Sequence, residues 1–287
     1  MRRLAILAIP LAALAVTATA TSSASVAASC AKGSLATVSD GKLTVGTDNP
    51  AYPPWFSGDP AKGSSWKISD PNSGKGFESA VAYAVAKQLG FSRANVAWKY
   101  TPFARSYAPG KKAFDFDINQ ISYSPARAKV VDFSNSYYDV NQAVVVLKGS
   151  KAAAAHSLAA LRGFKFGVQI GTTSYRAILD QIKPSSKPAV YDTNDKAVFA
   201  LKSKQIDALV VDLPTAFYVT AVQVPKGTIL GQLPAKAGGE HFGVVLQKGS
   251  PLTACVNGAL AKLKANGTLK QIQATWLSKV VGAPVLK

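Results

Sequence analysis

The chain has 287 residues, of which 48% are apolar and 17% are charged, and its formal net charge is +18. This length suffices for two lobes of ordinary size or for one large domain, and the composition excludes a disordered chain. The basic residues of the mature part are scattered, with no run beyond Lys111-Lys112, so no nucleic-acid partner is expected. Attraction to an anionic envelope surface or to an acidic partner is the milder interpretation of the charge.

Residues 1–28 have the pattern of a secretory signal peptide. Two arginines precede an apolar run over 4–16, and small residues with Ala-x-Ala-like cleavage sites follow near Ala20, Ala27 and Ala28. The run is too short to span a membrane comfortably, and no later stretch reaches about 18 apolar residues. The pattern therefore predicts an exported and soluble mature protein, periplasmic or extracellular.

The chain has two cysteines, Cys30 and Cys255. In the oxidising compartment that export implies, an even pair favours a disulfide, here between the mature N-terminus and a helix near the C-terminus. The alternative is a cell-surface lipoprotein acylated at Cys30. The preceding Ala27-Ala28-Ser29 lacks the leucine usual three positions before a lipidated cysteine, so the disulfide is preferred.

The first predicted strand, residues 42–46, leads into a segment rich in proline and aromatic residues. Asp48 and Tyr52 lie in this segment, where a carboxylate and aromatic rings could line a pocket. The alternative is a turn whose aromatic rings pack on the core. A loop rich in Gly, Pro, Ser and Asp follows over 57–76, and apolar residues at helical spacing predict a helix over 77–89.

Residues 115–134 give the strongest local signal for a functional site. An alternating apolar run predicts a strand with one buried face, and Gln120, Ser122 and Ser124 stand at its end. A proline suited to a first helical turn comes next, followed by Arg127. Open α/β sheets bind small ligands at such strand ends, and a guanidinium offers a planar fork of donors for a carboxylate. Alone, Arg127 could equally be a surface residue that caps its own helix.

A second unit of the same kind begins after a valine-rich strand within 137–149. The strand predicted over 165–169 leads to the sequence Gly-Thr-Thr-Ser at 171–174 and then to a helix. Free backbone N–H groups at such a helix start favour an anion site, although hydroxyl residues also serve as ordinary helix caps. No Gly-Lys-Ser/Thr follows, so the segment is not a nucleotide-binding loop.

A further strand, predicted over 206–211, ends at Asp212, directly before a helix. Asp212 could be a helix cap. The order of strand, polar residue and helix nevertheless repeats the one found in the first unit. This repetition predicts two similar lobes that face each other. A strand over 240–249 is interpreted as a return crossing, and two helices are predicted within 251–277.

Six motifs stand in one order along the mature chain: VGTDNPAYPPW, GKGFESAVAYAVAKQLG, QISYSPARAKVVDFSNSYY, GVQIGTTS, KQIDALVVDLPTA and VNGALAKLKANGTLKQI. In this order they resemble the extracellular amino-acid-binding proteins of ABC importers, solute-binding family 3. The resemblance implies an α/β fold of the two-lobed type II periplasmic-binding-protein kind, with the ligand cleft between lobes that two hinge strands join.

The crossings between the lobes give the expected boundaries. Lobe 1 is expected over 31–142 plus 243–287, and lobe 2 over 143–242. The hinge strands are expected at Asn141–Leu147 and Phe242–Leu246.

The resemblance also implies how a zwitterionic amino acid is held. Arg127 would pair with the α-carboxylate, and Asp212 would pair with the α-ammonium. Ser122 and the backbone N–H groups of Thr172 and Thr173 would assist at the carboxylate. The opposed charges would lie in a cleft that contains little water, where such pairing is strong.

Other residues would surround the ligand's side chain. Tyr52 and Phe103 are expected as aromatic walls, and Asp48 and Gln169 as further lining. Gln169 stands where some members of the family have lysine, and a neutral residue there suits a polar or a cationic side chain as easily as an acidic one. The complete expected ligand-binding set is Asp48, Tyr52, Phe103, Gln120, Ser122, Ser124, Arg127, Gln169, Thr172, Thr173 and Asp212.

Three functions follow from the sequence. The first is a monomeric binding protein that takes a free amino acid, expected to be polar, needs no cofactor and delivers its ligand to an ABC permease. The second is an enzyme on the same fold, similar to cyclohexadienyl dehydratase, with Glu78 or Asp48 as general acid or base. The third is a ligand sensor, which would share every binding residue. His156 and His241 lie far apart without ligand spacing, so no metal site is predicted.

Overall fold

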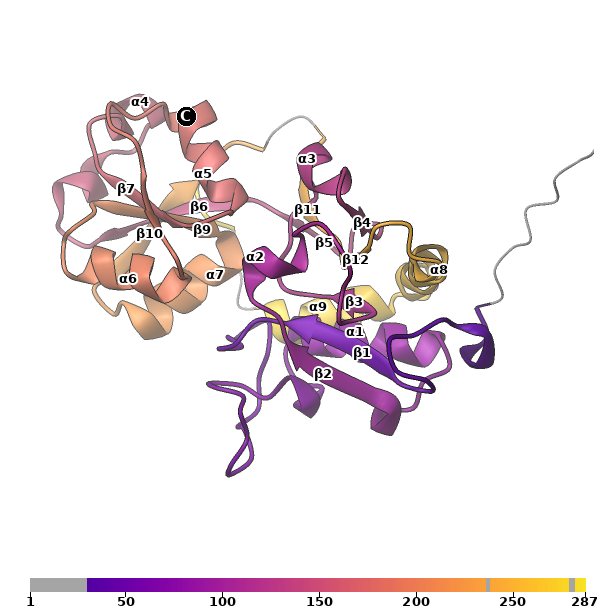
Figure 1. Cartoon of the computed structure of the whole chain (residues 1–287). Helices are drawn as coiled ribbons and strands as arrows, with labels where there is room; N and C mark the ends of the chain where they lie inside the picture. The colour runs from indigo at the N-terminus through magenta and orange to yellow at the C-terminus, as the bar shows by residue number, and fades with distance from the viewer. Residues whose placement is uncertain (1–29, 236–237, 279–281) are drawn as a thin grey trace, which may run out of the picture.

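The computed structural model describes residues 30–235, 238–278 and 282–287, and the predicted signal peptide lies outside them. Two five-stranded sheets form the centres of two lobes, with a two-stranded ribbon between them (Figure 1). The expected two-lobed α/β architecture is therefore confirmed. None of the helices in the described ranges combines the length and the apolar character that crossing a bilayer requires.

Lobe 1 is built on the sheet β2-β1-β3-β12-β4. The first three of these strands are parallel, and β12 runs antiparallel to both β3 and β4. The strands are β1 (Leu43–Thr47), β2 (Val96–Tyr100), β3 (Phe116–Asp117), β4 (Val131–Phe133) and β12 (Val245–Gln247). The helices are α1 (Phe77–Gln88), α2 (Phe103–Ser106), α3 (Pro125–Ala128), α8 (Leu252–Ala265) and α9 (Thr268–Leu277).

Helix α1 shows why lobe 1 folds in this way. Its buried residues Phe77, Val81, Ala82 and Val85 recur at helical spacing and form one apolar stripe, which joins the main hydrophobic cluster of the lobe. Gly90 follows the helix with φ of +83°, a conformation that glycine adopts without a steric cost. The stripe and the terminating glycine explain why the helix predicted over 77–89 forms within one residue of its expected end.

Lobe 2 is built on the sheet β10-β6-β9-β7-β8. Strand β6 runs antiparallel to β9 and β10, whereas β7 is parallel to β8 and β9. The strands are β6 (Gln142–Leu147), β7 (Phe166–Gln169), β8 (Ala189–Tyr191), β9 (Ala208–Asp212) and β10 (Gly227–Gln232). The helices are α4 (Leu158–Leu161), α5 (Thr173–Ala177), α6 (Asn194–Lys202) and α7 (Leu213–Tyr218), and π-helical turns extend α5 and α7 over Ile178–Ile182 and Val219–Gln223.

The two faces of the lobe 2 sheet are both covered. Along β6, Ala143 and Val145 belong to one hydrophobic cluster, and Val144 and Val146 belong to the other. This alternation follows from the two-residue period of a strand. A strand buried on both faces is a nearly continuous apolar run, which is the pattern that the sequence shows here.

The ribbon between the lobes pairs β5 (Tyr138–Val140) with the antiparallel β11 (Glu240–Phe242). The hinge strands were expected at Asn141–Leu147 and Phe242–Leu246, which begin at the ends of the two ribbon strands. Most of the first range is β6 of lobe 2, and the end of the second range lies in β12 of lobe 1. The apolar character of both ranges reflects burial in the two sheets, and the ribbon ends just before the first range and at the first residue of the second.

The last described residues lie on lobe 2, although the sequence placed all of 243–287 in lobe 1. Val285 forms a bridge with Gln232, and the Leu286 N–H donates to the Gln232 carbonyl oxygen at 2.9 Å. Leu286 is buried in the core of lobe 2. Because α9 packs in lobe 1, the chain passes between the lobes a third time. A segment this short has no periodicity that could predict its place.

Cys30 and Cys255 form a disulfide bond, which confirms the pairing predicted from the sequence. The bond joins the N-terminal segment to α8, so it lies within lobe 1. Acylation of Cys30 was the alternative, and the disulfide uses the same sulfur atom. Both cysteines of the chain are thus accounted for.

Candidate ligand-binding cleft

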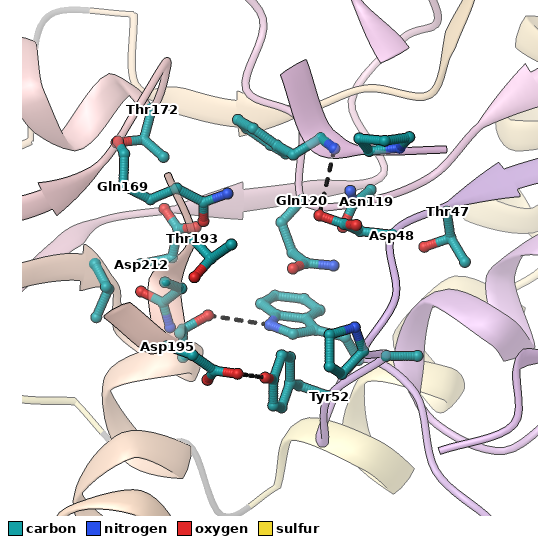
Figure 2. Close-up of a pocket in the computed structure, with 18 of the residues that line it drawn as sticks. Thr47, Asp48, Tyr52, Asn119, Gln120, Gln169, Thr172, Thr193, Asp195 and Asp212 are labelled. Carbon is teal, nitrogen blue, oxygen red and sulfur yellow. Dashed lines mark hydrogen bonds between the residues drawn. The ribbon is translucent and has the colours of Figure 1, made fainter. Parts of the chain in front are cut away.

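A cavity of about 290 Å³ lies between the lobes (Figure 2). Lobe 1 lines it with the loops after β1 and β3, and lobe 2 lines it with the loop after β7 and the starts of α6 and α7. The structure brings together all of the predicted ligand-binding residues except one: Asp48, Tyr52, Phe103, Gln120, Ser122, Arg127, Gln169, Thr172, Thr173 and Asp212. Ser124 is the exception, because its hydroxyl oxygen accepts the Arg127 backbone N–H at 3.3 Å and caps α3.

The ends of the strands explain why these side chains meet. Asp48 follows β1, Gln120 follows β3, Gln169 ends β7, and Asp212 ends β9. In open α/β sheets, ligands bind outside the carboxyl ends of parallel strands, because the loops there converge. The cavity is therefore formed where the two sheets direct these ends toward each other (Figure 2).

Arg127 is buried at the junction of the lobes, with 9% of its surface exposed. Its Nη1 donates to the Ser122 carbonyl oxygen at 2.5 Å, and its Nη2 donates to the Gly171 carbonyl oxygen of lobe 2 at 2.7 Å. The guanidinium lies 4.3 Å from the centre of the Tyr107 ring. Burial lowers the pKa of Arg127, although an arginine remains charged at neutral pH. Arg127 is thus not the surface cap that was one alternative, and its further N–H donors can meet an anion.

Asp212 faces the same cavity from lobe 2. Its Oδ1 accepts the Gln142 Nε2–H at 2.7 Å, and its side chain makes no capping hydrogen bond to α7. Burial, and then the charge of nearby Glu240, raises the pKa of Asp212 well above its ordinary value. A cation placed beside Asp212 would offset both effects, so this end of the cavity suits an ammonium group.

The aromatic segment after β1 both lines the cavity and packs in the core. The Tyr52 hydroxyl donates to Asp195 Oδ2 across the cleft, as Figure 2 shows, and Trp55 Nε1 donates to Thr215 Oγ1 of lobe 2 at 3.1 Å. Phe56 is buried in the core of lobe 1. Trp55 and Phe56 line the cavity and also belong to the core, so the two interpretations of this segment, a pocket wall and a packed turn, both apply.

Asp48 places a carboxylate on the lobe 1 side of the cavity, in addition to Asp212 on the lobe 2 side. Its oxygens accept the Asn49 N–H at 2.8 Å and the Phe103 N–H at 3.3 Å. Burial nevertheless raises the pKa of Asp48. Among the described lining residues, Asp48, Asp192, Asp195 and Asp212 are acidic and Arg127 is basic, so the cavity wall is acidic in a protein with a net charge of +18.

Glu78 lies behind the cavity wall rather than in it. Its carboxylate is fully buried, and it accepts the Gln120 backbone N–H at 2.7 Å as well as hydrogen bonds from the Gln120 amide and the Tyr137 hydroxyl. Burial raises the pKa of Glu78 to about 7, against the effect of these donors. Gln120 has φ of +49°, and Glu78 fixes it in this conformation. A role for Glu78 as acid or base on a substrate finds no support in this position.

Sequence reasoning missed several cleft residues. Asp195 and Thr215 lie at the starts of α6 and α7, where the strand-to-helix pattern that identified Asp212 could also have found them. Glu240 lies in the ribbon and contacts both lobes. Its contacts depend on how the lobes face each other, for which the sequence contains no local signal.

The fold and the cleft define a two-lobed binding protein whose lobes contribute opposite charges to one interlobe cavity. Residues 43–279 match the model of the bacterial extracellular solute-binding proteins, family 3, and the chain belongs to this family. The resemblance seen in the sequence motifs is thereby confirmed.

Individual relatives agree with this assignment. The chain is 30% identical to the L-cystine-binding protein TcyJ of Escherichia coli strain K12, over 86% of this chain and 85% of the relative. It is 30% identical to ABC transporter arginine-binding protein 1 of the same strain, over 78% of this chain and 86% of the relative. A solved ancestral arginine-binding protein bound to arginine is 32% identical, with a TM-score of 0.67, over 82% of this chain and 98% of that one. These relatives are named as binding proteins, which supports a solute-binding protein over an enzyme on the same fold.

Proposed function

We propose that the protein captures a free α-amino acid with a cationic side chain in the interlobe cleft and delivers it to the permease of an ABC importer. The observation that supports this most is the pair of opposite charges on one cavity, the buried Arg127 of lobe 1 and the half-buried Asp212 of lobe 2. A zwitterion is the ligand that neutralises both. The amino-acid-binding relatives support the same ligand class.

The remaining charges of the cavity favour a cationic side chain. Asp192 forms an exposed ion pair with Lys196 at 2.6 Å and is compensated. Asp48 and Asp195 remain after Arg127 and Asp212 have been assigned to the ligand's backbone groups. A second positive charge on the ligand would offset the desolvation of Asp48, and aromatic rings such as Tyr52 also attract cations. Two relatives named for arginine agree with this preference.

The setting of this activity follows from the family and the N-terminal pattern. The protein would be exported by way of its first 28 residues and would work outside the cytoplasm as a monomer. Arg127 and the backbone N–H groups of Thr172 and Thr173 would hold the α-carboxylate, and Asp212 would hold the α-ammonium. Closure of the lobes over the ligand would present the occupied form to the permease.

A thermal-shift screen of the mature protein tests this proposal. A ligand that binds only the folded state raises the melting temperature in a concentration-dependent way. Matched pairs isolate each charge: arginine against citrulline for the side chain, and arginine against its deaminated analogue for the ammonium group. We expect a clear rise with arginine or lysine and a much smaller rise with citrulline or with the amine-free carboxylate.

Each other outcome has a defined meaning. An equal rise with citrulline would remove the cationic preference and leave amino-acid capture in place. A rise with amine-free carboxylates alone would contradict the role of Asp212. The absence of a rise with every common amino acid would contradict the proposed function.

A further inference from the structure

Glu240 makes contacts that no other described carboxylate makes. Its Oε1 accepts the Ser122 hydroxyl at 2.6 Å and the Thr173 hydroxyl at 2.5 Å. Ser122 belongs to lobe 1, Thr173 begins α5 of lobe 2, and Glu240 begins the ribbon strand β11. One carboxylate oxygen of Glu240, a residue between the lobes, therefore accepts a hydroxyl hydrogen bond from each lobe.

The same carboxylate is tied to the ammonium end of the cavity. The Gln142 Nε2 lies 3.2 Å from each oxygen of Glu240 and 2.7 Å from Asp212 Oδ1. The other end of the Gln142 amide accepts the Ser174 hydroxyl at 2.7 Å. Thr173 and Gln142 both belong to lobe 2, so Glu240 is joined to lobe 2 through two separate side chains, and Ser174 holds the Gln142 amide in place.

These contacts show where two predicted ligand-binding residues, Ser122 and Thr173, direct their hydroxyl hydrogens. A serine or threonine hydroxyl has one hydrogen to donate, and both Ser122 and Thr173 lie within hydrogen-bond distance of Glu240 Oε1. With those hydrogens directed at Glu240, a ligand carboxylate would be met by the Arg127 guanidinium and by backbone N–H groups. Ser122 and Thr173 then act on the arrangement of the lobes.

We propose that Glu240 is a positioning residue of the ligand site, which stabilises the closed arrangement by holding Ser122 of lobe 1 and Thr173 of lobe 2 on one carboxylate. A hydrogen bond to a charged group in a partly buried place is stronger than one between neutral groups. We call these two hydrogen bonds, from Ser122 and Thr173 to Glu240, the clasp. Loss of the clasp lowers the population of the closed form. The apparent affinity falls with it, because only the binding-competent population holds the ligand.

The test compares the wild type with Glu240→Gln, and it uses Asp139→Asn as the matched control. Asp139 is an exposed carboxylate of the same ribbon, bonded to the Ser136 hydroxyl of its own segment. For Glu240→Gln we expect arginine affinity in calorimetry to fall about tenfold. We also expect the radius of gyration of the ligand-free variant, from small-angle scattering, to exceed that of the wild type. Asp139→Asn should change neither.

A double-mutant cycle separates the clasp from a general loss of stability. Glu240→Gln and Thr173→Val should not be additive in affinity, because the first weakens and the second removes the same contact. Additive effects, an unchanged affinity, or tighter binding by Glu240→Gln would overturn the proposal. Tighter binding would mean that Glu240 competes with the ligand's carboxylate for the two hydroxyls.

The affinity measurements rest on the proposed amino-acid ligand, whereas the scattering measurement does not. If no amino acid binds the wild type, the proposed function fails and the clasp is still tested by the ligand-free radius of gyration. If amino acids bind but neither affinity nor radius responds to Glu240→Gln, the clasp fails and the function stands.

Discussion

The two lobes share one architecture but differ in their cores and in what they bring to the cleft. Lobe 1 has an aromatic core in which the Trp55 ring contacts Phe77, Tyr138 and Phe242 at 5.7 to 5.9 Å between ring centres. Lobe 2 has two mainly aliphatic clusters, one on each face of its sheet. Lobe 1 supplies the buried guanidinium of Arg127, and lobe 2 supplies Asp212 together with hydroxyl residues at helix starts.

This difference predicts where the chain bends when the lobes close on each other. Tyr138 and Phe242 belong to the ribbon, yet they pack in the core of lobe 1. The ribbon is therefore part of lobe 1 in its packing, and bending is expected where the ribbon passes into lobe 2. Lobe 1 would then be the preformed half of the site, and lobe 2 would complete it on closure.

The largest expected effect comes from Arg127→Ala. Loss of the guanidinium leaves a ligand carboxylate without its counter-ion in a buried place, which costs about 3–5 kcal/mol, or more than a hundredfold in affinity. Calorimetric titration should show no binding, while circular dichroism keeps the wild-type spectrum. Arg176→Ala, at an exposed arginine of α5, is the control and should bind normally. Retained affinity in Arg127→Ala would contradict the role of lobe 1.

A pH effect on stability is expected from Glu78, behind the lobe 1 wall. Its pKa is about 7 in the folded protein against 4.5 in the unfolded chain. The folded state therefore binds more protons between these values, and stability falls as pH rises from about 4.5 to 7, by up to about 3 kcal/mol from this residue. Glu78→Gln should flatten this part of the pH profile in urea unfolding at pH 5 and pH 8. An unchanged pH dependence would contradict the prediction.

Asp212→Asn tests the lobe 2 half of the charge pair. A hydrogen bond to a charged partner contributes about 1.5–3 kcal/mol, so arginine should bind about ten- to a hundredfold more weakly. The raised pKa of Asp212 also predicts that wild-type affinity increases as pH rises past the ordinary range of an aspartate, because the ammonium group requires the ionised carboxylate. This pH dependence should be reduced in Asp212→Asn. The same dependence of affinity on pH in the wild type and in Asp212→Asn would contradict the role of Asp212.

The smallest expected effect concerns the hydrogen bond between Trp55 and Thr215 across the cleft. Thr215→Val keeps the shape of the residue and removes the acceptor, which should weaken binding about fivefold. Thr220→Val is the control, because the Thr220 hydroxyl bonds to carbonyl oxygens of its own helix. Equal affinities for the two variants would show that this bond does not contribute to closure.

The sequence predicted those features that local patterns encode. Strands that end in a polar residue before a helix predicted the two lobes, whereas the placement of Arg127 and Asp212 on one cavity was implied by the family resemblance. The count of cysteines and the inferred compartment gave the disulfide between Cys30 and Cys255. In each case the physical cause acts over a short stretch or through composition, so no three-dimensional information was needed.

The features that the sequence missed depend on contacts between distant segments. Glu240 has no neighbours in the chain that mark it, and its partners lie more than 60 residues away. Ser124 was expected to face the ligand, but the geometry of a helix start directs its hydroxyl to the backbone of α3. Leu286 packs on lobe 2 because it completes an apolar cluster there. The C-terminal segment around it is too short to carry a periodic pattern.

The positions of the two ends of the described chain have a practical consequence. Cys30 is fixed to lobe 1 by the disulfide, and Leu286 fixes the C-terminal segment to lobe 2, where Figure 1 marks the end of the chain. A donor fluorophore attached ahead of Cys30 and an acceptor attached after Lys287 would therefore ride on different lobes. Energy transfer between the two fluorophores would change when the lobes close. The labelled protein would therefore report binding of its own ligand, and labels at these positions would leave every cleft residue unmodified.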